Sequence, residues 1–495
     1  MSSLLSDPRI RLGACVLAMA VVGGLAVVTH PKQPTVDPQA AAKSPARSVV
    51  NRTALACPAL SQGGKQASVV NGVAPVLPEG TPTATGNATP LSIIALASTA
   101  DPIGSLLVRG KIASSTAATK PETLSIRGTG PLAAGAVGTS TTTAATGVNS
   151  GMASAPCQLP GSDFWFVGAS TAPGRRDVLT LTNLDSVNAA VNVTIYSNKG
   201  QLELPSARGL VIPARSTYEL FLDQVARSQK DLALHVESTG GRVAPALRDY
   251  ASKADQTPAG VDWIGPAAPP ATKVYVPGSA PGKGQRTLVL VNPTDLQATI
   301  RLTVNGPNGP FKPAALETVR LPAGAVMAVK LEAVLNGDPS GVSLESDQPV
   351  TASLRMTDKD NSDFASIGAA ETLTGPAYLV LPAHKQEALL QVTAPGTKPA
   401  SVKIDLRDAA GKSLLSRAVD VVAGSTTKIP FKAATGPTYL TVEQTRSSVV
   451  AAVTLMPAAK PGDDDTPEVA AWPLNTSLVF RAQLGAQPDV RAALR

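Results

Sequence analysis

The stretch Leu288–Gly309, LVLVNPTDLQATIRLTVNGPNG, shows the pattern that decides the fold of this 495-residue chain. Apolar and polar residues alternate, pause at NPTD, alternate again, and stop at a Gly/Asn/Pro turn. A period of two is typical of strands that bury one face and expose the other. Ile300, Leu302 and Val304 should therefore point inward together, because a one-residue slip would bury Arg301 instead.

The same plan occurs in two further copies, LTLTNLDSVNAAVNVTIYSNKG from Leu179 and LLQVTAPGTKPASVKIDLRDAAG from Leu389. We interpret the opening of each copy as a hairpin, whose polar pause lets the strand leave the edge before it re-enters the sheet. Strand–turn–strand segments follow in the same order: GLVIPARSTYELFLD (Gly209–Asp223), TVRLPAGAVMAVKLE (Thr318–Glu332) and AVDVVAGSTTKIPFK (Ala418–Lys432). With a short lead strand, each copy holds about seven strands in ~100 residues, as an immunoglobulin-like sandwich does.

The expected fold is all-β, with an N-terminal transmembrane helix followed by tandem immunoglobulin-like sandwiches. Each sandwich should own a core, which makes the chain a tethered rod. The predicted parts are a cytoplasmic N-terminus (1–11), a transmembrane anchor (12–29), a linker (30–48), an Ala/Thr/Gly-rich β segment (49–160), three sandwiches (161–273, 274–377 and 378–457), and an acidic linker and tail (458–495). Within 129–156, strand, loop and disorder all stay open, and VAAWPLNTSLVFRAQL near the end could be a last strand or a packed tail.

The anchor is the uncharged apolar stretch Leu12–Thr29. At about 1.5 Å per residue it spans roughly 27 Å, against a bilayer core of ~30 Å. Arg9 and Arg11 place the N-terminus in the cytoplasm. A cleaved signal peptide is the alternative, but the nearest small-residue site, 40–42, lies too far beyond the apolar stretch, so we favour an uncleaved anchor. A single-pass protein of the cell membrane, with the bulk of the chain extracytoplasmic, is the expectation.

Cys57 and Cys157 are the two cysteines beyond this anchor. An even pair outside the cytosol predicts one disulfide. In the chain-entropy model, closing such a loop stabilises the fold by about 4–5 kcal/mol. We expect the bond to fasten the segment 49–160 onto the first sandwich.

Composition limits the function classes. Lys and Arg total 43 against 36 Asp and Glu, and the basic residues are scattered, whereas nucleic-acid binding needs a concentrated basic face. We therefore expect no nucleic-acid partner. Aromatic residues make up only 3%, so the cores must rest on aliphatic side chains.

Catalysis needs a cluster of reactive side chains, and the sequence offers none. His30, His235 and His384 have no second ligand at metal spacing. The S-x-x-K match at 425–428 lacks the helix and the companion motifs of serine enzymes that recognise penicillin. We expect no catalytic, cofactor-binding or metal-binding residue. The stretch 358–363 is rich in Asp but lacks the Gly and Glu of an EF-hand, which leaves a looser Ca²⁺ site open.

The densest aromatic patch, Phe164, Trp165 and Phe166, is a possible binding surface. A core-edge role is the alternative. Strict alternation sends Trp165 opposite to its neighbours, so its ring needs either exposure or a covering partner.

With CP at Cys57-Pro58, CQLPGSDFWFVGAS at Cys157–Ser170 and this order of repeats, the chain resembles an uncharacterised actinobacterial family of membrane-anchored, secreted β-sandwich proteins, filed as a domain of unknown function. The likeness covers roughly residues 50–460. The third copy departs from the pattern, with Ala394-Pro395 where the second has Asn292-Pro293. The resemblance implies a bacterial envelope location and carries no catalytic residues.

We therefore expect a non-enzymatic cell-envelope protein, a membrane-tethered sandwich array that binds an envelope protein or cell-wall glycan. The alternative is an enzyme or accessory subunit acting on envelope polysaccharide, with two carboxylates ~5–10 Å apart in a cleft. An ion-dependent adhesin is a third option. Paired acids in a pocket would favour the enzyme, and an apolar or aromatic surface would favour the binder.

Overall fold

In the computed structural model, β21 (Ala298–Gly306) has the register that its alternation predicts. Ile300, Leu302 and Val304 are fully buried, whereas Arg301 is exposed. The equivalent inward sets are buried too: Val191, Val193 and Ile195, and Val402, Ile404 and Leu406. The structure describes residues 47–60, 66–82, 84, 86, 89–96, 101–118, 122–456 and 469–482. Almost all regular structure in these ranges is strand, which confirms the all-β class.

Copy 1 forms two sheets around one core. One sheet has the order β10-β16-β12-β13, with β14 also paired to β12, and the other has the order β15-β11-β17-β18. The elements are β10 (Asp163–Ala169), β11 (Val178–Asn183), β12 (Ala189–Ser197), β13 (Gly200–Leu202), η3 (Pro205–Ala207), β14 (Leu210–Ile212), β15 (Ser216–Phe221), α2 (Leu222–Val225), β16 (Leu232–Gly240), β17 (Ala244–Ser252) and β18 (Pro258–Ile264).

Copy 2 repeats this arrangement, except that one long strand serves both sheets. The first half of β25 pairs with β19 and β21, and its second half pairs with β20 and β26. The remaining elements, with β21 above, are β19 (Ala271–Val276), β20 (Arg286–Val291), β22 (Gly309–Phe311), β23 (Thr318–Leu321), β24 (Val326–Lys330), α3 (Glu332–Leu335), β25 (Gly341–Thr357) and β26 (Phe364–Gly368).

Copy 3 has the sheet orders β27-β32-β29-β30 and β31-β28-β33-β34. Its strands are β27 (Ala377–Leu381), β28 (Ala388–Thr393), β29 (Ala400–Asp408), β30 (Ser413–Val421), β31 (Thr426–Phe431), β32 (Thr438–Arg446), β33 (Val450–Leu455) and β34 (Ala470–Leu474). The last strand lies where the sequence predicts a linker and tail, so copy 3 extends beyond residue 457. The acidic residues 463–465 lie outside the described residues.

The segment 49–160 is a fourth copy of the same topology, which the sequence did not predict. Its sheets, β2-β7-β4-β5 and β6-β3-β8-β9, match those of copies 1 and 3 strand for strand. We call it the N-terminal copy. Its elements are β2 (Arg52–Cys57), β3 (Ala67–Val73), β4 (Leu91–Ala95), β5 (Gly104–Leu106), β6 (Ile112–Ser114), β7 (Leu124–Thr129), η2 (Gly130–Leu132), β8 (Val137–Ala144) and β9 (Gly151–Pro156); β1 (Arg47–Val49) and β35 (Phe480–Ala482) lie outside the copies.

The polar pauses are crossovers between sheets, which corrects the hairpin interpretation. β20 and β21 flank NPTD yet belong to opposite sheets. Inward-facing alternation looks the same whether two strands share a sheet or face each other, so the sequence could not separate these cases. Fully buried Asn292 holds the crossover, donating its side-chain amide to the carbonyl oxygens of Leu296 (2.7 Å) and Pro322 (3.1 Å). Copy 3 has Ala394 here.

The strand order is only partly that of an immunoglobulin domain. Counting β13 and β14 together as the fourth strand, the second strand pairs with the fifth and the third with the sixth, as in immunoglobulins. The first strand, however, pairs with the sixth, and the seventh pairs with the second. Alternation does not encode which sheet the first and the seventh strands join.

The disulfide between Cys57 and Cys157 is present, with a Cα–Cα distance of 4.3 Å. Both cysteines lie in the core of the N-terminal copy, at the end of β2 and just after β9. The bond therefore closes one copy on itself, and does not fasten it to copy 1 as predicted.

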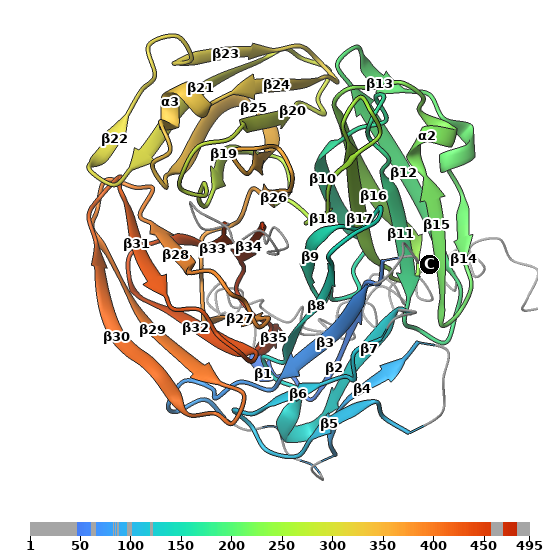
Figure 1. The fold of residues 1–495 in the computed structure, drawn as a ribbon, viewed down its shortest axis with the longest axis vertical. Coiled ribbons are helices and arrows are strands. Elements are labelled where there is room, and N and C mark those ends of the chain that lie inside the picture. Colours follow the sequence, from blue (N-terminus) through green and yellow to red (C-terminus); the bar gives the residue numbers. More distant parts are fainter. Residues whose placement is uncertain are drawn as a thin grey trace, which may run out of the picture. The chain divides into compact units, whose positions relative to one another are not determined.

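The eighth strands join the copies within the unit Val49–Arg481. Neighbouring members of the series β9, β18, β26, β34 contact each other, and β34 contacts β9 again (Figure 1). Met152 of β9 packs into the core of copy 3, and Thr139 of β8 donates its hydroxyl to the carbonyl of Val380 (2.6 Å). Each copy keeps a core of its own, as predicted, but the copies form one compact unit and not a rod, because the last strand of each contributes to a shared centre.

No helix within the described ranges is long and apolar enough to span a membrane. The predicted anchor, 12–29, and the parts 1–11 and 30–46 beside it lie outside those ranges.

Candidate functional site

The aromatic strand β10 is an interface inside the molecule and is not an exposed patch. Phe166 is fully buried in the core of copy 1, and Phe164 packs against the same core. Trp165, which is 5% exposed, points the other way and stacks on His235, with ring centroids 4.2 Å apart. Copy 2 covers it, because Trp165 belongs to the same buried apolar cluster as the core of copy 2. The backbone N–H of Ala267 also donates to the Trp165 carbonyl at 2.7 Å. Of the two predicted outcomes for this ring, the structure shows the covering partner.

Charged side chains gather where copies 1 and 2 meet, but they satisfy each other. Asp249 accepts two hydrogen bonds from Arg175 (2.7 and 2.6 Å) and one from Arg355 (3.4 Å). The Arg355 guanidinium also lies 3.8 Å from the ring centroid of Phe364. Burial, and then the charge of Arg175, lower the pKa of Arg355 to about 10. A network this deeply paired holds the two copies together.

The Asp-rich stretch 358–363 directs its carboxylates at backbone N–H groups. Asp358 accepts from the N–H of Ser362 (2.7 Å), and buried Asp363 accepts from Phe364 (2.9 Å) and Val469 (3.2 Å). Burial raises the pKa of Asp363 well above its usual range. Across the described residues, no group of three or more His, Cys, Asp or Glu side chains could hold a metal ion.

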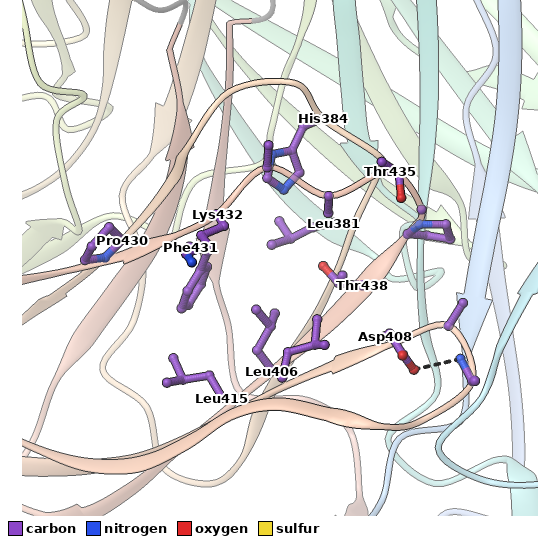
Figure 2. Close-up of a pocket in the computed structure, with 17 residues that line it drawn as sticks. Leu381, His384, Leu406, Asp408, Leu415, Pro430, Phe431, Lys432, Thr435 and Thr438 are labelled. Atoms are coloured by element: carbon purple, nitrogen blue, oxygen red, sulfur yellow. Dashed lines mark hydrogen bonds between the residues drawn. The ribbon is translucent and has the colours of Figure 1, made fainter.

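An open cavity of about 800 Å³ lies in copy 3 and is the best candidate for a ligand site (Figure 2). Its apolar wall comes from both sheets and combines the core residues Leu381, Leu406 and Phe431 with half-buried Leu415 and exposed Pro430. Lys432, Asp408 and His384 also line it. A pocket of this size suits a small organic molecule.

The connection between the fifth and sixth strands explains why this cavity exists. In copy 2 it covers 331–340 and contains α3, whose Leu335, together with Leu331 just before the helix, is buried in the core. In copy 1 it covers 222–231 and contains α2, with Leu222 buried. Copy 3 has only 432–437, and no helix.

The sequences show the exchange directly. Copies 1 and 2 read LDQVA and LEAVL after the fifth strand, whereas copy 3 reads KAATG. Exposed Lys432 thus stands where copies 1 and 2 bury a leucine. Two backbone hydrogen bonds between His384 and Ala434, at 2.9 and 3.0 Å, hold the shortened connection. No side chain from this connection enters the core, so the end of the sandwich stays open.

Polar groups in the cavity differ in how far they are engaged. Asp408 accepts hydrogen bonds from the N–H groups of Ala410 (3.0 Å) and Lys412 (2.9 Å), which ties it into its own turn. Thr438, in contrast, is only 4% exposed, and its buried hydroxyl has no hydrogen-bond partner. Burial of an unpaired hydroxyl costs free energy that a ligand's polar group would recover. Sequence reasoning did not single out any of these residues.

Comparison with known proteins adds a family but no activity. A model of a family of unknown function, DUF5719, matches residues 112–432 and 379–492. No curated protein matches. Among solved structures, Thermotoga maritima 1070 is 22% identical, covering 20% of this chain and 93% of that one at a TM-score of 0.18. Latent PorU from Porphyromonas gingivalis is 10% identical, covering 64% of this chain and 34% of that one at a TM-score of 0.13.

Proposed function

Because the chain belongs to the DUF5719 family of unknown function, we propose a role from its own geometry: a non-enzymatic binding protein of the bacterial envelope. Its ligand site is the copy 3 cavity, and the ligand is a lipid whose aliphatic chain enters between the two sheets. The observation that carries this proposal is the missing helix, which leaves core leucines of copy 3 facing an open cavity where copy 2 has α3.

An aliphatic chain suits the wall of the cavity. Leu381, Leu406 and Phe431 line the cavity but are only 1%, 7% and 3% exposed, whereas Leu414 and Pro430 on the same lining are exposed. Removing such apolar surface from water is favourable by about 25 cal/mol per Å². The free hydroxyl of Thr438 and the amino group of Lys432 lie at the same cavity and suit an oxygen-bearing or anionic head group. The expected ligand is therefore amphipathic, with a long apolar part.

The disulfide supports an extracytoplasmic location, because such bonds persist in oxidising compartments. An uncleaved anchor at 12–29 would keep the protein beside the lipids that it binds. Actinobacterial origin and membrane attachment remain part of this proposal.

Carboxylate placement favours binding over the alternative of polysaccharide cleavage. The copy 3 cavity is lined by one carboxylate, Asp408, and a second cavity, whose lining includes Tyr378 and Trp263, is lined by none. Glycosidases need two such groups facing one substrate. The test below also distinguishes a lipid from a protein or glycan partner at copy 3.

The test labels membranes carrying the full chain with a diazirine fatty acid and maps the adducts by peptide mass spectrometry. We expect adducts on the strands that contain Leu406 and Phe431. The decisive variant replaces residues 432–437 with the copy 2 segment 331–340, LEAVLNGDPS, which supplies the missing helix. These adducts should then fall about tenfold, while labelling elsewhere in the chain stays constant and serves as the reference.

Ala418→Leu, on an exposed position of β30 outside the cavity, is the matched control and should label like the parent chain. Equal labelling of the copy 3 strands in the chimera would refute the lipid site. So would an absence of adducts together with retention of the chain on cell-wall glycan or on a protein partner that the chimera no longer binds.

A further inference from the structure

A second cavity, of about 560 Å³, is lined by five arginines. It lies where the N-terminal copy meets copy 1, well away in sequence from the copy 3 cavity. Arg52 comes from β2, Arg127 from β7 and Arg481 from β35, while Arg215 and Arg242 come from turns of copy 1. Residues far apart along the chain thus bring like charges to one place.

The cavity has far more positive than negative charge. Its one carboxylate is Asp185, and Arg242 already engages it with two hydrogen bonds, at 2.8 and 3.1 Å. Within the part of the chain that the structure describes, no ion pair involves Arg52, Arg127, Arg215 or Arg481. Arg127 is half-buried and the other four arginines are exposed, so water screens part of their mutual repulsion, and a bound anion would offset the rest.

The pKa of Arg127 agrees with this geometry. Burial, and then the charge of Arg215, lower it. The charge of Arg215 therefore reaches the Arg127 guanidinium, and an anion bound beside Arg127 would offset that repulsion.

Arg215 is held in an unfavourable backbone conformation. Its φ is 53°, in the left-handed region, where a side chain costs free energy and glycine does not. The equivalent turn positions in copies 2 and 3 are Gly324 (φ 61°) and Gly424 (φ 69°). Copy 1 thus carries an arginine where its sister copies use the unstrained residue, and backbone strain of this kind collects at functional sites.

We propose that this arginine cavity binds a phosphate group, either of a soluble phosphate ester or of a lipid head group. A guanidinium presents paired N–H donors that match two phosphate oxygens at once, and several such groups suit the charge of a phosphate. The hydroxyl-bearing residues Thr53, Thr129 and Ser186 line the same cavity. Its volume leaves room for the group that bears the phosphate.

The experiment measures binding to the full chain in a neutral detergent by isothermal titration calorimetry. Glycerol 3-phosphate tests the soluble source, and short-chain phosphatidylglycerol tests the lipid source, each against its phosphate-free counterpart, glycerol or short-chain diacylglycerol. Arg127→Gln should weaken phosphate binding by about tenfold or more, the loss expected for a charged hydrogen-bonding group. Arg215→Gly should weaken it similarly while raising the Tm, since it relieves the strained backbone.

Arg320→Gln, at an exposed arginine of β23 outside this cavity, is the matched control and should bind like the parent chain. Binding of glycerol 3-phosphate or of the phospholipid that both cavity variants weaken supports the site and names the source. Affinity unchanged in Arg127→Gln and Arg215→Gly, no binding of either ligand, or equal affinity for succinate would overturn the phosphate assignment. The copy 3 chimera, which tests the lipid cavity, should leave this binding intact, so the two proposals fail separately.

Discussion

Copies 2 and 3 share one topology yet end differently. Copy 2 closes its sandwich with α3, which buries Leu335, and copy 3 replaces that turn of helix with a shorter connection around Ala434. The surrounding strands pair in the same order in both copies. One short connection therefore decides whether the end of such a sandwich is filled by core residues or holds a cavity. A repeated fold can therefore gain a ligand site without any change in its sheets.

The variant Leu335→Ala tests directly whether α3 fills the core of copy 2. We expect the free energy of unfolding to fall by about 2–5 kcal/mol, because the variant leaves a cavity in a packed core. Urea denaturation followed by tryptophan fluorescence measures the loss. Leu414→Ala, at a leucine that is 52% exposed beside the copy 3 cavity, is the control and should change stability by about 0.5 kcal/mol or less. Losses of the same size in both variants would show that α3 does not fill copy 2.

The crossovers give the next largest contrast. Asn292→Ala should destabilise copy 2 by about 1–3 kcal/mol, because the carbonyl groups of Leu296 and Pro322 lose the buried amide donor that holds the crossover. The reverse change, Ala394→Asn in copy 3, should not stabilise, since backbone hydrogen bonds of Ala394 with Gly424 (2.8 Å) and Ser425 (3.1 Å) already close that crossover. Thermal unfolding of both variants checks the pair, and a stabilised Ala394→Asn would contradict this account.

The turn before the fifth strand extends the comparison to copy 1. Arg215→Gly should stabilise by about 0.5–1 kcal/mol, since relief of a left-handed side chain exceeds the added flexibility of the unfolded chain. Gly324→Ala in copy 2 makes the opposite change and should lose about 1 kcal/mol. Calorimetric Tm values test both, and a lower Tm for Arg215→Gly would mean that the arginine stabilises the fold.

The smallest expected effect comes from filling copy 3 directly. Ala434→Leu lines the cavity with one more apolar group, and we expect a gain of about 0.5 kcal/mol together with weaker fatty-acid labelling. Ala418→Leu adds the same group at an exposed site and should gain nothing. If both variants behave alike, the copy 3 cavity is not an apolar container.

Inward and outward faces were predictable from alternation, as the buried set Ile300, Leu302 and Val304 shows. The sandwich topology of the N-terminal copy was not predictable, because its strand β8, VGTSTTTA, is buried although its residues are mostly polar. Its hydroxyls bond to neighbouring segments, Ser140 to the carbonyl of Pro58 (2.7 Å) and Thr141 to Ser154 (2.8 Å). Strands whose buried groups are hydroxyls show no apolar periodicity, so the period-two signal failed there.

The candidate sites could be found in the sequence only by aligning the copies with one another. Aligning LDQVA, LEAVL and KAATG would have exposed the missing leucine of copy 3, and aligning PARS with PAGA would have marked Arg215. For Trp165 the sequence left two outcomes open, exposure or a covering partner, and the structure decides between them, because a ring that faces outward from one copy is covered by the next. Single-copy patterns cannot report contacts between copies.

The shared centre also sets the order in which the protein can mature. β9 is made early, yet its contacts with β34 and the packing of Met152 into copy 3 require the last part of the chain. Until then a growing chain keeps apolar side chains and strand edges bare, which invites aggregation and proteolysis. A premature stop ahead of Val469 would therefore also destabilise the N-terminal copy, which loses its contacts with β34. Cellular proteases would then degrade the truncated chain.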